Sequence, residues 1–133
     1  MQYKNATILL GLMAMLATPV SAQNEPHFDE DGPFREGEGF GTPATCETMA
    51  DWIDRVPDYG GRISMVIDGA IVENHFDGAL AYLIMCEPED IQVMCITYHD
   101  HDASDEIVRF AGGYNRNAER QIILDPCLVY PAD

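Results

Sequence analysis

The feature that most restricts the fold of this chain is a pair of apolar segments around an acidic turn, each of which carries one cysteine. The segments are 79–86 and 91–98, and Glu87-Pro88-Glu89-Asp90 separates them. Two short apolar runs on either side of a four-residue polar turn are typical of a β-hairpin. The hairpin is therefore predicted to be the structural hub of the fold, with Cys86 and Cys95 in adjacent strands.

The sequence contains four cysteines in all. They are Cys46, Cys86, Cys95 and Cys127. An even number of cysteines in a small exported chain indicates a disulfide framework. Zinc and thioredoxin-like redox sites commonly use CxxC pairs, and the spacing here contains none. We therefore expect two structural disulfides.

The register of the hairpin bears on which cysteines are joined. With a loop at 87–90, Cys95 faces Tyr82, and Cys86 lies four residues further along the sheet. That separation is about 13 Å at ~3.3 Å per residue, whereas a disulfide needs Cα atoms within about 7 Å. A Cys86–Cys95 bridge is therefore disfavoured. The two pairings that join the hairpin to Cys46 and Cys127 both stay open.

The first 22 residues have the pattern of a secretory signal peptide. A single cation, Lys4, precedes the apolar run 6–18, and small residues follow before an expected cleavage after Ala22. A retained membrane anchor is the alternative, but the run is shorter than the roughly 20 residues that span a bilayer. The mature chain is expected to be periplasmic or secreted, with no stable membrane anchor after cleavage.

The mature chain is strongly acidic. Lys4 is the only lysine and leaves with the signal, so six arginines remain against 23 acidic residues, a formal charge of −17 compared with −16 for the full sequence. Such a surface repels phosphate backbones and anionic lipid headgroups. Nucleic acid is therefore not expected as a partner.

The segment that follows the signal changes character at about residue 42. Residues 23–41 are acidic and rich in Gly and Pro, without apolar periodicity, which predicts a flexible acidic leader. A helix is predicted next, because Thr42 can cap it, Pro43 suits the first helical position, and apolar residues recur at helical spacing. Pro57 ends this helix at about Arg55.

The remainder of the chain has a β pattern. The predicted strands are 62–73, 79–86, 91–98, 106–112 and 120–129, with a polar loop at 99–105 and a turn at 114–117. Gly69 inside the first strand suggests a bulge or sharp coil, and Pro126 inside the last suggests an edge position or a local break.

This layout favours a small closed barrel, since closure removes exposed strand edges. The fold class is therefore predicted as mainly β, with a five-stranded barrel preceded by one short α-helix. Residues 42–133 would form this helix-plus-barrel domain.

The layout resembles the OB-fold, in particular the small exported bacterial domains in which a helix precedes the barrel. The resemblance rests on the apolar patterns of 66–72, 80–85, 91–96, 107–112 and 122–124. It implies a five-stranded OB-like barrel that serves as a ligand-binding or stress-associated module. Because OB-fold barrels close between strands three and five, it also implies disulfides Cys46–Cys86 and Cys95–Cys127. The helix that many OB-folds carry between strands three and four has no room in 99–105.

One loop has the composition of a metal site. It is His99-Asp100-His101-Asp102. Two imidazoles and two carboxylates can ligate a transition metal if alternate residues converge on one ion. The alternative is a solvated acidic loop, because a stable site needs three or four ligands in fixed geometry. No cofactor is expected other than a divalent metal at this loop.

Three arginines and a tyrosine near the C-terminal end form the cationic cluster of an otherwise acidic chain. They are Arg109, Tyr114, Arg116 and Arg120. Such a cluster can receive an anionic ligand or partner. The alternative is that the arginines pair with acidic neighbours.

No serine or cysteine nucleophile stands beside a histidine in a known catalytic motif, so no catalytic residue is assigned. We expect a non-catalytic exported binding or interaction module, whose barrel face takes an unknown protein or small ligand. A metal-handling protein that uses the His99–Asp102 loop is the alternative.

Overall fold

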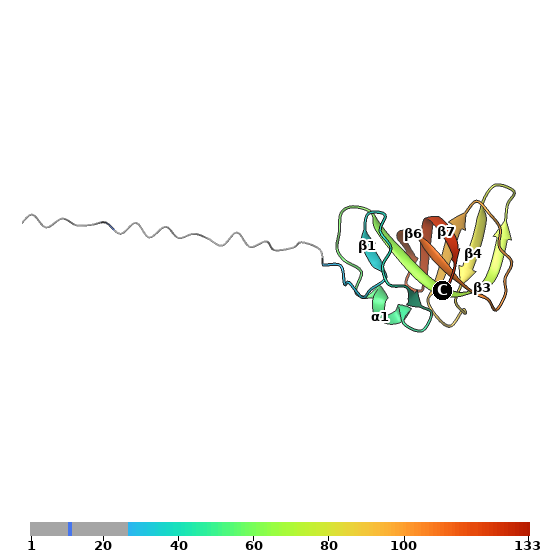
Figure 1. Cartoon of the computed structure of the whole chain (residues 1–133), viewed down its shortest axis with the longest axis horizontal. Coiled ribbons are helices and arrows are strands. Elements are labelled where there is room, and N and C mark those ends of the chain that lie inside the picture. The colour runs from blue at the N-terminus through green and yellow to red at the C-terminus, as the bar shows by residue number, and fades with distance from the viewer. Residues whose placement is uncertain (1–10, 12–26) are drawn as a thin grey trace, which may run out of the picture.

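The computed structural model describes Gly11 and residues 27–133. Its elements are β1 (Phe34–Glu36), β2 (Ala44–Thr45), α1 (Met49–Ile53), β3 (Ile63–Phe76), β4 (Ala81–Met85), β5 (Gln92–Thr97), β6 (Ile107–Ala118) and β7 (Gln121–Pro131). Strands β3 to β7 form a barrel, and β1 and α1 lie together at one end of it (Figure 1). The prediction of a mainly β fold with one short helix before a barrel is confirmed.

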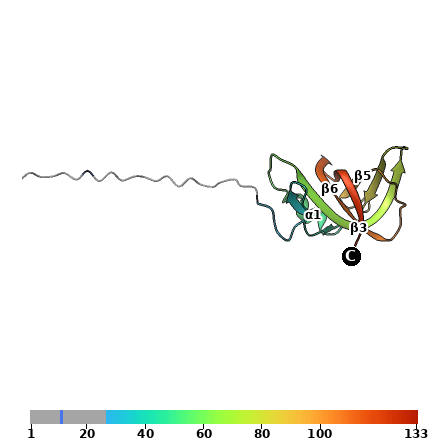
Figure 2. The same cartoon turned by 45° about the horizontal axis from the view of Figure 1, so that its top comes forward.

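The barrel closes because β3 pairs with both β4 and β6. The order around it is β3-β4-β5-β7-β6, and β6 returns to β3. Strands β5 and β7 run parallel over Gln92–Cys95 and Gln121–Leu124, while the other barrel pairs are antiparallel. Figure 2 shows the long curved path by which β3 reaches both neighbours. This closed five-stranded barrel is consistent with the OB-like arrangement expected from the layout.

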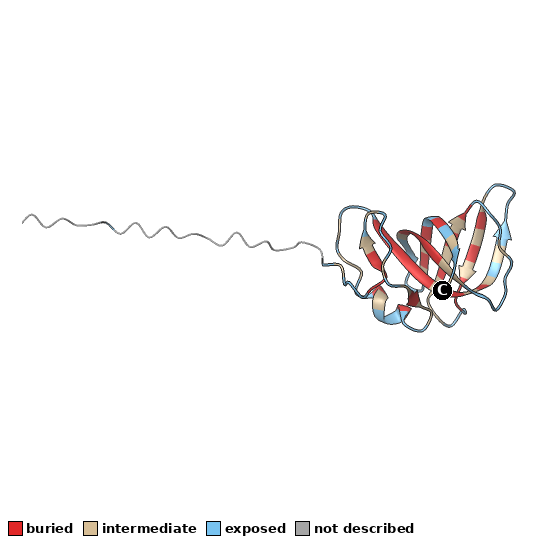
Figure 3. Ribbon diagram, viewed as in Figure 1, coloured by how far each residue is buried: buried red, intermediate tan, exposed pale blue. Residues whose placement is uncertain are grey.

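Alternation along the strands places apolar side chains inside the barrel. In β3, Met65, Ile67 and Ile71 point inward and are at most 4% exposed. The other strands add Leu83, Met85, Val93, Phe110, Ile122 and Leu124 to the same core. Figure 3 shows the resulting run of buried residues along the strands, with exposed residues concentrated in the loops.

Gly69 serves close packing and does not mark a bulge. A Cβ added there would lie 2.8 Å from the Cγ and Sδ atoms of Met85 and 3.0 Å from Sγ of Cys46. The irregularity in the β3–β4 register instead falls between Ile71 and Glu73. The glycine is required because two side chains occupy the space that a Cβ would need.

The turn predicted at 114–117 is wrong, because β6 continues through these residues to Ala118. Tyr114 packs edge-to-face on Phe34, with ring centroids 5.3 Å apart, and this contact joins β6 to β1. The chain reverses instead after Ala118, where the Arg116 guanidinium donates hydrogen bonds to the carbonyls of Ala118 and Glu119.

The local break predicted at Pro126 is present. Strand β7 pairs with β5 only as far as Leu124, so Pro126 lies past the end of that ladder. The β6–β7 register also shifts between Gly112 and Tyr114, which leaves Pro126 outside the paired positions. A residue without an N–H is tolerated there because no ladder hydrogen bond is lost.

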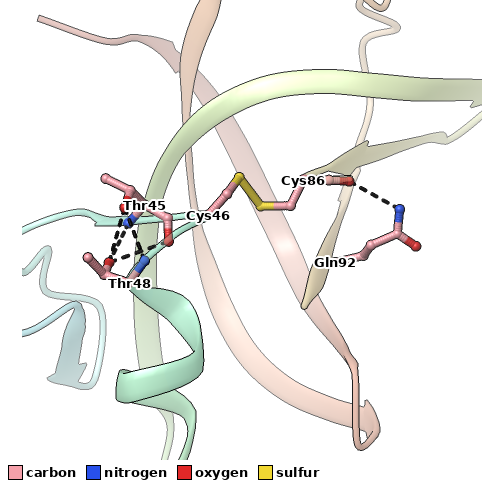
Figure 4. Close-up of a disulfide and its surroundings, with 5 residues drawn as sticks. All are labelled: Thr45, Cys46, Thr48, Cys86 and Gln92. Carbon is pink, nitrogen blue, oxygen red and sulfur yellow. Dashed lines mark hydrogen bonds between the residues drawn. A yellow bond between two sulfur atoms is a disulfide. The ribbon is translucent and has the colours of Figure 1, made fainter. Parts of the chain in front are cut away.

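The helix is shorter than predicted and begins later. Instead of starting at Pro43, the chain forms β2, which pairs in parallel with Ile67 and Asp68 of β3. Thr45 and Thr48 then exchange hydrogen bonds, since the backbone N–H of each donates to the hydroxyl of the other (Figure 4). This local pairing directs the chain into α1, which has only five residues.

The leader predicted over 23–41 is in part a structured segment. Strand β1 pairs antiparallel with β3, and Phe34 is 3% exposed in the core. Arg35 fixes the preceding turn, because its guanidinium donates to the carbonyls of Asp29 and Glu30. The prediction of flexibility is therefore wrong for this part of the leader, because a core contact that composition does not reveal holds it in place.

Both disulfides join the pairs that the resemblance implied. Figure 4 shows the bond between Cys46 and Cys86. The Cα atoms are 5.5 Å apart in this pair and 5.4 Å apart in the Cys95–Cys127 pair. The hairpin register is one residue off the prediction, since Cys95 faces Leu83 and not Tyr82.

The predicted signal peptide, residues 1–22, lies outside the described residues apart from Gly11. Among those that the structure describes, no helix combines the length and the apolar character needed to cross a membrane.

Candidate functional site

The loop with the predicted metal ligands is open and acidic. His99, Asp100 and Asp102 are exposed, and His101 is partly exposed. The side-chain amide of Asn74 donates hydrogen bonds to both carboxylate oxygens of Asp100, at 3.2 and 3.3 Å. Within residues 27–133, no group of three or more His, Cys, Asp and Glu side chains is arranged to hold a metal ion. The four residues of this loop are adjacent in the sequence, but the fold does not bring their side chains together around one metal site.

The predicted cationic cluster is divided between two places. Arg109 and Arg116 lie seven residues apart on the same strand, which corresponds to about 23 Å. Arg116 binds the carbonyls of the β6–β7 turn, and Arg120 donates to the carbonyl of Glu89. Tyr114 lies between Arg109 and Arg116 on β6 and is half-buried. Burial raises the pKa of its hydroxyl above the ordinary value, because the ionised form loses hydration. The four residues do not form one anion site.

Arg109 is held in a fixed orientation by Asp68. The two residues are direct partners in the β3–β6 ladder. Nε donates to Oδ1 of Asp68 at 2.7 Å, and Nη2 donates to Oδ2 at 3.0 Å. This two-point contact raises the pKa of Arg109 above its ordinary value, against the opposing effect of burial. The alternative prediction was that the arginines pair with acidic neighbours in the sequence. Arg109 does pair with an acidic residue, but Asp68 is 41 positions away in the chain.

Beside Arg109, the outer surface of the barrel is hollowed. The hollow has a volume of about 380 Å³ and is lined by Phe40, Gly41, Val66, Arg109, Ala111, Tyr130, Pro131 and Asp133. We call it the Phe40 groove. Its floor forms where β3 and β6 pair Val66 with Ala111. Both side chains are small, and Val66 lies on the opposite face of β3 from the core residues, so the floor is apolar and low.

Two aromatic rings in edge-to-face contact form one wall of the Phe40 groove. Phe40 is 60% exposed and Tyr130 is 36% exposed. Their ring centroids lie 5.9 Å apart at an interplanar angle of 72°. Leu128 of β7, which is 54% exposed, extends the apolar surface to a second hollow of about 310 Å³, which Phe40 also lines. Apolar side chains this exposed and this close together are typical of a binding surface.

The loop that carries Phe40 is anchored to the barrel. Gly37 has φ +69°, a conformation that glycine adopts without strain, and its N–H donates to the carbonyl of Arg62 at 2.8 Å. Its carbonyl accepts a hydrogen bond from the hydroxyl of Ser64, which is 2% exposed. Phe40 is therefore presented by a fixed loop, and the groove is formed in advance of any ligand.

Sequence reasoning found one residue of this site, Arg109, and missed the two rings of the aromatic wall. Phe40 fell in the segment that composition marks as a leader. Leu128 and Tyr130 alternate at the end of the last strand, and this alternation is a signal that could have marked an apolar outer face. Asp68 gave no signal, because only the β3–β6 pairing brings it to Arg109.

No family model matches this chain, and neither a curated protein nor a solved structure matches it.

Proposed function

We propose that this protein is a non-catalytic, exported binding module that takes a small apolar molecule in the Phe40 groove. The observation that carries the proposal is the exposure of Phe40 and Tyr130 on fixed backbone above an apolar floor. A volume of about 380 Å³ is within the range of small-molecule sites, roughly 300–1,000 Å³. A preformed site avoids the cost of ordering a loop when the ligand binds.

The disulfides support the part of the proposal that concerns location. Two disulfides are compatible with an oxidising, extracytoplasmic compartment, and none of the cysteines is free. Together with the signal-like N-terminus, they favour a periplasmic or secreted protein. The strand order and the parallel β5–β7 pair further support assignment to the exported OB-fold domains that the layout resembles.

The charge of the protein supports a ligand other than nucleic acid. A mature chain with a formal charge of −17 repels phosphate backbones, and the two aromatic residues of the groove lie beside one arginine that already contacts Asp68. Nucleic-acid surfaces combine stacking residues with several free cations. The groove has the stacking residues and lacks the cations.

The proposal is tested with a neutral apolar fluorophore, N-phenyl-1-naphthylamine, titrated into the disulfide-bonded protein. Phe40→Ala removes one of the two rings that form the aromatic wall of the groove. Since covering the exposed part of a phenylalanine contributes about 1–2 kcal/mol, the affinity should fall about 5- to 30-fold. Tyr98→Ala is the matched control, because Tyr98 is an aromatic residue that is 71% exposed outside the groove.

Equal losses in the two variants would contradict the proposal, as would the absence of binding to the wild-type protein. Both substituted side chains are largely exposed, so neither variant should change the melting temperature by more than a few degrees.

A further inference from the structure

The edge of Arg109 that Asp68 does not use is available at the Phe40 groove. A guanidinium has five N–H donors, and Asp68 accepts from Nε and Nη2 only. Among residues 27–133, Nη1 makes no hydrogen bond, and its ion-pair partner is Asp133, 3.7 Å from Oδ2. Both Arg109 and Asp133 line the groove. One end of an apolar site therefore carries an oriented cation.

Asp133 holds this position weakly. Its side chain is 96% exposed, and a separation of 3.7 Å exceeds the usual range of an N–H···O hydrogen bond. Ion pairs this exposed contribute little, because water and salt screen them. A second carboxylate with better geometry can therefore replace Asp133 at Nη1 without breaking the contact between Arg109 and Asp68.

We propose that the Phe40 groove selects small organic acids, with the apolar body against the rings of Phe40 and Tyr130 and the carboxylate on Nη1 of Arg109 in place of Asp133. This inference rests on the proposed function and adds the chemical class of the ligand. The hydrogen bonds to the carboxylate are charge-assisted, so they are stronger than those to a neutral amide of the same shape.

The acidity of the whole protein does not prevent this selection. At physiological ionic strength the Debye length is about 8 Å, so exposed charges beyond the groove are largely screened. Inside the groove, a ligand carboxylate that replaces Asp133 leaves the Arg109 guanidinium in contact with two carboxylates, as it is without the ligand. The local charge balance that the fold already accommodates is therefore preserved.

The test compares 2-naphthoate with 2-naphthamide, which share one apolar body and differ in charge, by calorimetric titration of the disulfide-bonded protein. At physiological ionic strength, the wild-type protein should bind the acid about tenfold more tightly than the amide. Asp133→Asn removes the competing carboxylate and should strengthen binding of the acid about 1.5- to 5-fold, with no change for the amide.

Two further variants isolate the contact. Asp102→Asn makes the same change in net charge at an exposed loop residue outside the groove, and it should leave both affinities unchanged. Asp68→Asn combined with Arg109→Gln removes both members of the ion pair, so no single buried charge is left unpaired. This double variant should lose the preference for the acid over the amide while it keeps the wild-type circular dichroism spectrum.

The outcomes separate the two proposals. If the wild-type protein binds acid and amide equally and Asp133→Asn has no effect, the inference about carboxylates is wrong and the proposed function stands. If it binds neither, the proposed function fails as well. A peptide with a C-terminal phenylalanine that binds more tightly than 2-naphthoate would make the occupant a polypeptide end and would overturn the assignment to a small acid.

Discussion

The two disulfides should differ in their contribution to stability, although they close loops of similar length. Removing a cross-link restores entropy to the unfolded chain, and the cost grows with the logarithm of the loop length. For the sequence separations of 40 and 32 residues, this gives about 3.9 kcal/mol for Cys46–Cys86 and about 3.7 kcal/mol for Cys95–Cys127. On this basis alone the two bridges are equivalent.

Burial makes them unequal. Cys95 and Cys127 are 0% and 2% exposed, while Cys46 is only partly buried beside Cys86. Each buried sulfur replaced by hydrogen should cost about 1 kcal/mol more, like one methylene removed from a core. Cys95→Ala with Cys127→Ala should therefore cost about 5–6 kcal/mol, and Cys46→Ala with Cys86→Ala about 4–5 kcal/mol. Urea unfolding followed by circular dichroism measures both.

The position of the Cys95–Cys127 bridge gives the larger loss a structural meaning. Cys95 is the last β5 residue of the parallel ladder with β7, so the bridge fixes the strands where their hydrogen bonds end. Losses of this size approach the whole stability of many domains, which is about 5–15 kcal/mol. The reasoning is refuted if the Cys46–Cys86 variant is the less stable one, or if either pair costs less than 1 kcal/mol.

Three further predictions concern single residues. Gly112→Ala should cost about 1–3 kcal/mol in chemical unfolding, because its Cβ would clash with the backbone carbonyl oxygen of Pro126. Gly60→Ala, with open space around it, should cost under ~0.5 kcal/mol, and equal effects would contradict the β6–β7 packing. Phe34→Ala should lower the free energy of unfolding by about 3–5 kcal/mol, because Phe34 is 3% exposed. Phe40→Ala should lower it by less than about 0.5 kcal/mol, because Phe40 is 60% exposed. A small loss of stability for both variants would mean that β1 is not docked. Asp77 accepts hydrogen bonds from two backbone N–H groups of its turn, and these lower its pKa below the ordinary 3.8. Its stabilising effect is therefore full above that pH and is lost as the pH falls through the lowered pKa of the folded state. The stability difference between wild type and Asp77→Ala should shrink in acid, and a difference that grows would refute the assignment.

The sequence contains enough information for the barrel because its strands carry their own signals. The acidic turn at 87–90 and the two cysteine-bearing runs define a hairpin locally, and alternation of apolar residues gives the inner face of each strand. The error of one residue in the hairpin register did not alter the conclusion that Cys86 and Cys95 are too far apart to bond.

Features that depend on distant contacts could not be predicted in the same way. Phe34 and Phe40 lie in one Gly-rich acidic segment, and nothing local distinguishes the first, which is in the core, from the second, which is in the groove. The contact of Phe34 with Tyr114 decides the difference. Likewise, the orientation of Arg109 depends on Asp68, and the β3–β6 pairing that joins them exists only in the folded barrel.

The most direct test of the binding role is the map of chemical-shift changes in ¹⁵N-labelled, disulfide-bonded protein when N-phenyl-1-naphthylamine is added. The proposed function predicts that the largest backbone shifts fall at Phe40, Val66, Ala111 and Tyr130, where the rings and floor of the groove meet the probe. Shifts centred on another part of the barrel, such as the outer side of β4 and β5, would contradict it.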